Sequence, residues 1–136
     1  MKRTATAHWE GDLKTGKGNI STQSTVLNKT QYSFNTRFAD GVGTNPEELL
    51  AAAHAGCFTM AVSATLAQTG IIATSLDTVA TLTLEGLDVT GIHLSIKGVV
   101  PGITKEQFEE TTKGAEKNCI ISKALKTPIT SEAVLL

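Results

Sequence analysis

A long apolar segment with clear helix signals at both ends dominates this chain, at residues 44–68. Asn45 can cap a helix, Pro46 suits the first helical position, and Glu48 completes a capping-box pattern. Gly70 follows the last good helix formers and can adopt the left-handed conformation that ends a helix. The helix is apolar almost all the way round, which predicts burial on most of its sides rather than a place at a surface.

The composition indicates a globular protein and disfavours two classes of partner. The 136 residues are 40% hydrophobic, which is enough for one domain with a hydrophobic core over residues 1–136. A formal net charge of −1 and 4% aromatic residues indicate neither a nucleic-acid partner nor binding to an anionic membrane. The first residues lack the apolar region of a secretory signal, and the most apolar run, residues 49–62, is too short to span a bilayer. We therefore expect a soluble cytoplasmic protein.

Alternating residue types before the long helix predict a β-meander. Its three strands are expected at residues 3–9, 19–27 and 31–35. Residues 36–43 form a glycine-containing loop that leads into the helix, and loops of this kind often carry functional residues.

The part of the chain after Gly70 predicts two longer strands in a hairpin, a charged surface helix, a short helical turn and a last strand. Thr104 begins the charged helix, and Gln107 completes a capping box there. The expected elements lie at residues 76–84, 92–100, 104–118, 120–125 and 129–135. The whole is an α+β fold in which the β-meander and further antiparallel strands pack around a long buried central helix.

Two cysteines, Cys57 and Cys119, stand far apart in the sequence and form no CxxC motif. Zinc normally needs about four ligands at short spacings. Two cysteines and three scattered histidines (His8, His54 and His93) do not supply that pattern, so we expect no zinc site. In a reducing cytosol a disulfide is more often transient and catalytic than structural.

A reactive Cys57 would need a cation from elsewhere in the protein. Burial without a charged partner raises the pKa of a thiol, and Cys57 is about three turns into the helix, beyond the reach of the helix dipole. Arg37 on the preceding loop is the best candidate, and Glu47 in the first helical turn is the carboxylate that can accompany it. Glu47 lies about 15 Å from Cys57 along the axis, so either Arg37 bridges the gap or Glu47 comes from a second chain. An all-round apolar helix also needs a partner, which suggests a homodimer.

Each of these residues also has an ordinary structural interpretation. Cys57 can be a small core residue, Arg37 a solvated surface residue, and Glu47 a favourable charge at a helix start. His54 can be a hydrogen-bonded core residue, or it can act as the base in acyl transfer by Cys57, since the two share one helix face. A third possibility is a non-enzymatic redox sensor or small-molecule-binding dimer.

The segment 44–58 closely resembles the signature helix of the osmotically inducible protein C (OsmC) family, which includes the organic hydroperoxide resistance (Ohr) proteins. The resemblance extends along almost the whole chain and favours the OsmC branch. In the Ohr branch the key arginine lies nearer the N-terminus, whereas here it is Arg37, before the helix. The resemblance rests also on residues 7–12, 34–38, 101–103 and the region of Cys119. One departure is Ile120, which stands where many relatives have proline.

The resemblance implies a thiol-dependent peroxidase that reduces organic hydroperoxides and hydrogen peroxide. Carried over by position, Cys57 is the peroxidatic cysteine and Cys119 resolves its sulfenic acid as an intramolecular disulfide. Arg37 would stabilise the thiolate and polarise the peroxide, and Glu47 would orient Arg37. The family forms an intertwined homodimer, uses no metal or prosthetic group, and takes its electrons from a dithiol such as a lipoyl group.

Overall fold

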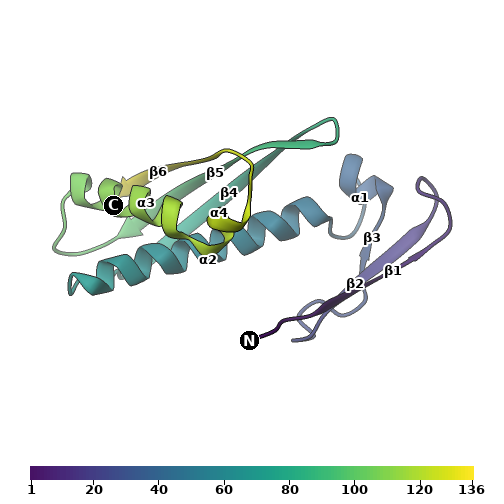
Figure 1. The fold of residues 1–136 in the computed structure, drawn as a ribbon, viewed down its shortest axis with the longest axis horizontal. Coiled ribbons are helices and arrows are strands. Elements are labelled where there is room, and N and C mark those ends of the chain that lie inside the picture. Colours follow the sequence, from purple (N-terminus) through teal and green to yellow (C-terminus); the bar gives the residue numbers. More distant parts are fainter. The chain divides into compact units, whose positions relative to one another are not determined.

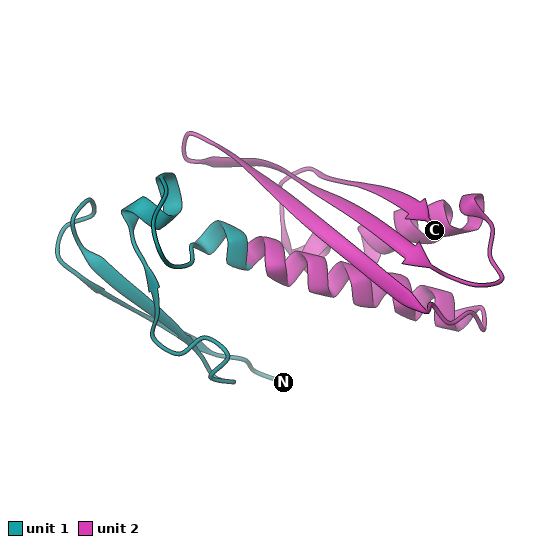
Figure 2. Ribbon diagram, turned by 180° about the vertical axis from the view of Figure 1, so that it is seen from behind, with its two compact units in different colours: residues 1–49 teal, residues 50–136 magenta.

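A computed structural model of the chain describes residues 1–136 and divides them into two compact units, shown in separate colours in Figure 2. Unit 1 is Met1–Leu49 and unit 2 is Leu50–Leu136. The boundary falls within the central helix α2 (Pro46–Gln68), so one continuous helix belongs to both units. A single domain over the whole chain stays a prediction.

Unit 1 contains the expected β-meander. Its strands are β1 (Ala5–Glu10), β2 (Lys17–Thr22) and β3 (Thr30–Tyr32), which pair antiparallel in the order β1-β2-β3 (Figure 1). Strand β2 ends earlier than predicted because the backbone turns after Thr22. Thr25 donates its N–H to the Thr22 carbonyl and adopts a φ of 63°, a conformation outside the range of a strand.

A short helix, α1 (Phe34–Phe38), occupies the place where the end of a strand and a loop were predicted. Its start is a capping box in which Thr36 takes the position usual for Glu or Gln. The Ser33 hydroxyl accepts from the Thr36 N–H, and the Thr36 hydroxyl accepts from the Ser33 N–H at 2.8 Å. These bonds satisfy the N–H groups of Ser33 and Thr36 at the start of the helix that carries Arg37.

Unit 1 buries no hydrophobic side chain. The buried residues in this part of the chain are Gly18, Thr36 and Thr44. Trp9 and Tyr32 face each other with ring centroids 5.4 Å apart, and a Cβ on Gly18 would collide with both rings. The close approach of the two aromatic rings therefore requires glycine, yet it does not amount to a hydrophobic core.

Helix α2 begins and ends as the sequence predicts, with one change at its start. The Asn45 Oδ1 accepts from the Glu48 N–H at 2.8 Å, as in a capping box. The Glu48 carboxylate, however, accepts from the Thr44 hydroxyl at 2.7 Å. At the other end Gly70 has a φ of 76°, the left-handed conformation that terminates a helix.

The prediction that α2 is buried on most of its sides is wrong for a single chain without a partner. Its buried residues recur every four positions along a single stripe and are His54, Phe58, Val62 and Leu66. Because the rest of unit 2 covers only this stripe, apolar side chains on the other faces stay open, as with Met60, which is 74% exposed. By length and composition alone the whole helix could cross a membrane. The expectation that the apolar segment is too short to span a bilayer, which considered only residues 49–62, is therefore corrected. The core helix of a soluble protein passes the same test.

Unit 2 holds a second three-stranded sheet in the order β4-β5-β6 (Figure 1). Strands β4 (Ser75–Glu85) and β5 (Asp88–Val99) form the predicted antiparallel hairpin. The prediction that the last strand is also antiparallel is wrong, since β6 (Ile129–Leu135) runs parallel to β5. The chain crosses back through α3 (Lys105–Asn118) and α4 (Ile120–Ala124) before β6 begins, and such a crossover is what a parallel pair requires.

The core of unit 2 forms between α2, α3 and β5. The Thr104 capping box with Gln107 starts α3 as predicted, with both of its hydrogen bonds present. Phe108 and Ala115 point from α3 into the core and are almost completely buried. The other main core residues are Phe58, Val62, Leu66, Ile92, Leu94, Ile96 and Cys119. Cys119 is therefore a member of this core.

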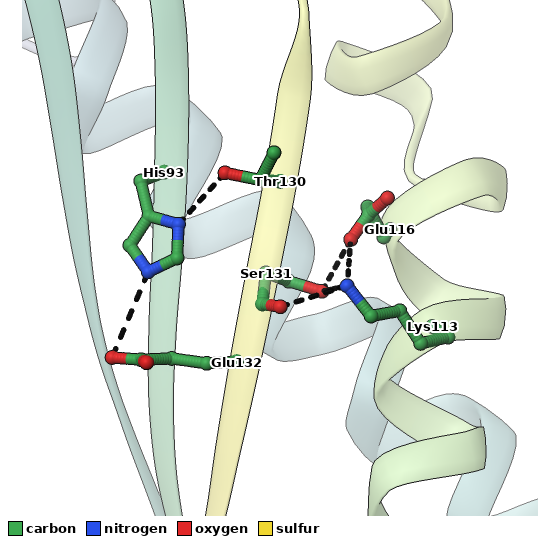
Figure 3. Close-up of polar contacts among 6 residues, drawn as sticks. All are labelled: His93, Lys113, Glu116, Thr130, Ser131 and Glu132. Carbon is green, nitrogen blue, oxygen red and sulfur yellow. Dashed lines mark hydrogen bonds and ion pairs between the residues drawn. The ribbon is translucent and has the colours of Figure 1, made fainter.

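A lysine joins α3 to β6 (Figure 3). The Lys113 Nζ donates to the Ser131 carbonyl at 2.7 Å and lies 3.0 Å from the Glu116 carboxylate, which also accepts from the Ser131 hydroxyl. Burial would raise the pKa of Glu116, but the bonds from Ser131 and Lys113 outweigh burial and hold that pKa below its usual range. These contacts fix the helix that ends at Cys119.

We expect Glu116→Gln to destabilise the protein by about 1–2 kcal/mol at neutral pH. A carboxyl group with a lowered pKa in the folded state stabilises the fold above its unfolded pKa, and this contribution is lost as the pH falls through the folded pKa. The difference in urea-unfolding free energy between the wild type and the variant should therefore shrink below about pH 4.3. Glu110→Gln, on the exposed face of the same helix, is the matched control and should show no such trend. A difference that is constant with pH would contradict the expected linkage.

Candidate active site

The two cysteines come together in unit 2 although they are far apart in the sequence. Cys57 lies on α2. Cys119 is both the C-cap residue of α3 and the N-cap residue of α4. Their Sγ atoms are 3.0 Å apart, within hydrogen-bonding range for two thiols, and both cysteines are free. Cys119 is buried, at 2% exposed, whereas Cys57 is partly open to solvent. A disulfide bond of about 2.05 Å requires only a small further approach.

Burial and hydrogen bonding give the two thiols different acidities. Burial raises the pKa of Cys57, and its hydrogen bond with Cys119 raises it further. Burial would also raise the pKa of Cys119, but its hydrogen bonds with Cys57 and Ser122 outweigh burial and lower it. Within unit 2, Cys119 is thus the more easily ionised of the pair. Cys57 can become the reactive thiolate only if a cation is added, as the sequence predicted.

Arg37 and Glu47 come together in unit 1. The Arg37 Nη2 and Nε lie 2.7 and 2.9 Å from the same oxygen, Oε1, of Glu47. Glu47 is 16% exposed and Arg37 44%, and the second carboxylate oxygen of Glu47 is buried without a partner. The contact fits the expectation that Glu47 orients Arg37. The structure thus groups the four predicted site residues into two pairs, one in each unit.

An apolar pocket of about 290 Å³ adjoins Arg37 within unit 1. The Arg37 guanidinium lies 5.3 Å from the centre of the Phe38 ring, which helps to hold its orientation. The side chains that line the pocket are mostly aromatic or aliphatic and are Trp9, Leu13, Tyr32, Ser33, Phe34, Arg37, Phe38 and Pro46. Such a pocket suits a ligand with an apolar body and one polar end.

His54 does not contact Cys57 as a catalytic base would. Its ring is completely buried, and its Nε2 lies 2.7 Å from the hydroxyl of Ser122 in α4. Burial lowers the pKa of His54, so the ring is neutral at physiological pH. This engagement removes the main support for acyl transfer by Cys57 with His54 as base.

Ser122 is a site residue that the sequence analysis missed. Its hydroxyl lies 2.7 Å from His54 Nε2, and it is the third residue of the short helix that Cys119 caps. The sequence signal that could have identified Ser122 is its position three residues after Cys119, the N-cap residue of α4. No group of three or more His, Cys, Asp or Glu side chains in this structure could hold a metal ion.

The fold and the paired cysteines define an α+β protein with a long central helix and a redox-capable dithiol. A family profile described as OsmC-like protein matches residues 39–133 of the chain. Peroxiredoxin OsmC of Escherichia coli is 48% identical over 128 residues, which cover 91% of this chain and 90% of that protein. The chain belongs to the OsmC-like protein family, and the predicted resemblance is confirmed.

Solved structures confirm the predicted fold class. An OsmC-like protein of Vibrio cholerae superposes with a TM-score of 0.75 at 18% identity, covering 98% of this chain and 99% of that one. An organic hydroperoxide resistance protein of Bacillus subtilis gives a TM-score of 0.67 at 23% identity, with 98% of each chain covered. The parallel strand β6 and the long helix α2 are thus parts of an OsmC-like fold.

Proposed function

We propose that this protein is a soluble, cytoplasmic, thiol-dependent peroxidase that reduces organic hydroperoxides, and hydrogen peroxide, by a disulfide cycle between Cys57 and Cys119. The observation that carries the proposal is the 3.0 Å separation of the two sulfur atoms beside an apolar groove. Relatedness to a protein named peroxiredoxin supports the same activity.

In the first step, the Cys57 thiolate attacks one oxygen of the peroxide O–O bond. A sulfenic acid forms on Cys57, and the second oxygen leaves as an alkoxide that takes a proton to become the alcohol. Arg37 supplies the positive charge that the thiolate and the departing oxygen require. Glu47, bonded to Arg37 through Oε1, holds the guanidinium in place.

In the second step, the Cys119 thiolate attacks the sulfur of the Cys57 sulfenic acid. The hydroxide leaves and takes a proton, so that one disulfide and one water form. The pKa of Cys119, lowered by its hydrogen bonds, favours the ionised form that this attack needs. A dithiol of the lipoyl type then reduces the disulfide by thiol–disulfide exchange and restores both thiols.

A homodimer supplies what a single chain lacks. Unit 1 buries no hydrophobic side chain, and most faces of α2 stay uncovered, as Met60 illustrates. Both features favour an intertwined dimer in which a second copy covers these surfaces. In this proposal each active site combines the Arg37–Glu47 pair with the cysteine pair, within one chain or across the dimer.

The chemistry of the two cavities favours an organic substrate. The pocket beside Arg37 is lined mostly by aromatic and aliphatic side chains, and the guanidinium is the one charged group among them. A groove of about 780 Å³ runs past Cys57 and Cys119, and half of the residues that line it are alanine, isoleucine or methionine. Alkyl hydroperoxides have the apolar body and polar end that such surfaces accept.

Mass spectrometry of the reduced protein tests this cycle. One equivalent of cumene hydroperoxide should remove two hydrogens, and peptide mapping should locate them to a Cys57–Cys119 link. Dihydrolipoamide should then restore the original mass. Two unmodified thiols after peroxide treatment would contradict the proposal, and Cys57 would be a core residue of a binding protein.

A further inference from the structure

We propose that His54 is a positioning residue for the resolving step: through its hydrogen bond with Ser122 it fastens helix α4 to helix α2 and keeps the Cys119 sulfur within reach of Cys57. This inference rests on the proposed disulfide cycle and gives a role to a buried side chain that the cycle as described above does not use. His54 and Ser122 are 68 positions apart in the sequence, yet their Nε2 and Oγ atoms are 2.7 Å apart.

Cys119 is the joint between two helices. Its backbone, with a φ of −55° and a ψ of 130°, interrupts the helical path between α3 and α4. The Cys119 N–H donates to the Ala115 carbonyl in α3, and the Cys119 carbonyl accepts from the Lys123 N–H in α4. The position of the Cys119 sulfur therefore depends on how firmly each of the two helices is held to the rest of the protein.

The two helices are held in different ways. Helix α3 buries three of its residues and is tied to β6 by Lys113 and Glu116 (Figure 3). Helix α4 has no buried residue, and its side chains make a single hydrogen bond to another helix or strand, the bond between Ser122 and His54. On the α4 side of the joint, this bond is the directional contact that can fix the position of Cys119.

His54 is a rigid anchor for this bond. Its ring is completely buried in the stripe of α2 residues that faces the core of unit 2, about one helical turn before Cys57. The ring Nδ1 has no hydrogen-bond partner, and a buried polar atom without a partner makes the ring a poorer core residue than an apolar side chain of similar size. What the histidine adds to the core is therefore the bond of its Nε2 to Ser122.

This anchor acts on the second step of the cycle and not on the first. The attack of Cys57 on the peroxide involves neither His54 nor α4. In the second step the Cys119 thiolate must reach the sulfur of the Cys57 sulfenic acid, form the S–S bond and displace hydroxide, which takes a proton to become water. With α4 anchored, the two sulfur atoms are 3.0 Å apart. Groups held in such a geometry react as if at a very high concentration, and loosening one of them lowers that effective concentration.

The test measures how the Cys57 sulfenic acid divides between the disulfide and the over-oxidised sulfinic acid. Reduced protein is treated with a range of cumene hydroperoxide concentrations without reductant, and mass spectrometry counts the two products. In His54→Phe, which keeps a ring in the core, and in Ser122→Ala, a milder change, the concentration that over-oxidises half of the chains should fall about tenfold, the effect of losing one buried hydrogen bond.

Matched variants separate this role from a general loss of structure. In chains that also carry Cys119→Ser, the rates of the first oxidation and of over-oxidation should be the same with and without His54→Phe. His54→Gln can place an amide N–H near the position of Nε2 and should recover most of the disulfide yield. Ser63→Ala, an exposed change on α2, should leave the yield unchanged.

An unchanged division of products in both His54→Phe and Ser122→Ala, with circular dichroism showing folded proteins, would overturn the proposal. Equal slowing of both steps would overturn it as well, because a merely structural role has that effect. The equilibrium of the cysteine pair with lipoamide and dihydrolipoamide gives a second readout that needs no peroxide. If the wild type turns over no peroxide but His54→Phe makes the disulfide about tenfold less stable in this exchange, the positioning role stands and the proposed peroxidase function fails.

Discussion

Cys57→Ser should abolish peroxide turnover, with a loss of at least about 10⁴-fold, the scale seen when a catalytic nucleophile is removed. A serine hydroxyl is scarcely ionised at neutral pH and is a much weaker nucleophile than a thiolate toward a peroxide. The measurement is consumption of cumene hydroperoxide with dihydrolipoamide as reductant. Full turnover in Cys57→Ser would show that the reaction occurs at another residue.

Cys119→Ser is the matched control because it removes the other sulfur of the pair. This variant should still consume one peroxide per chain, since Cys57 remains. Its sulfenic acid has no resolving thiol, so it should accumulate, react with dimedone and oxidise further to the sulfinic acid under excess peroxide. If Cys57→Ser consumes no peroxide and Cys119→Ser consumes one per chain, Cys57 is the peroxidatic cysteine and Cys119 is the resolving cysteine.

Arg37→Met should lower kcat/KM for the hydroperoxide by about 10²–10³-fold, the effect of removing one stabilising donor from an active site. Burial and the Cys119 contact both raise the pKa of Cys57, so without the guanidinium little thiolate is present at neutral pH. Arg37→Lys retains the charge but cannot reproduce the contacts of Nε and Nη2 with Glu47, and it should recover only part of the rate. Equal rates for the wild type and Arg37→Met would remove Arg37 from the mechanism.

Mixed dimers decide which chain supplies Arg37. Neither Arg37→Met nor Cys57→Ser should be appreciably active alone. If each site takes its arginine from the partner, refolding the two variants together in equal amounts should restore about a quarter of the sites. If Arg37 acts within its own chain, the mixture should stay inactive.

Local signals predicted the helices best. The ends of α2 followed from Asn45, Pro46 and Gly70, because caps are set by a few neighbouring residues. Helix α1 was missed because Thr36 takes the place of the usual Glu or Gln in its capping box. The capping-box rule as we applied it admitted only Glu or Gln at this position, although a threonine hydroxyl can accept the same hydrogen bond.

Relations between distant segments could not be predicted from patterns of residues. The direction of β6 depends on the path through α3 and α4, and nothing within residues 129–135 distinguishes a parallel from an antiparallel strand. The burial of α2 on only one stripe depends on how much of the chain is available to cover it. The direction of β6 and the burial of α2 both depend on which other segments pack against them, and the residues of the segment itself do not determine this.

In the candidate site, too, local chemistry could be predicted from the sequence, whereas contacts between distant segments could not. The need for a cation beside Cys57 followed from the cost of burying a charge, and the pKa direction in the structure agrees with it. The approach of Cys119 to Cys57 came from family resemblance, because sequence spacing does not reveal it. Ser122 became visible only when α4 placed its hydroxyl against His54.

The uncovered β-meander has a consequence for how this protein responds to dilution. A three-stranded sheet needs a covered hydrophobic face to be stable on its own, and Met1–Leu49 buries no hydrophobic side chain. If a second copy covers that face, folding and association are one equilibrium, and the melting temperature must rise with protein concentration. The abundance of the protein in the cell would then set the fraction of chains with a formed Arg37–Glu47 pair.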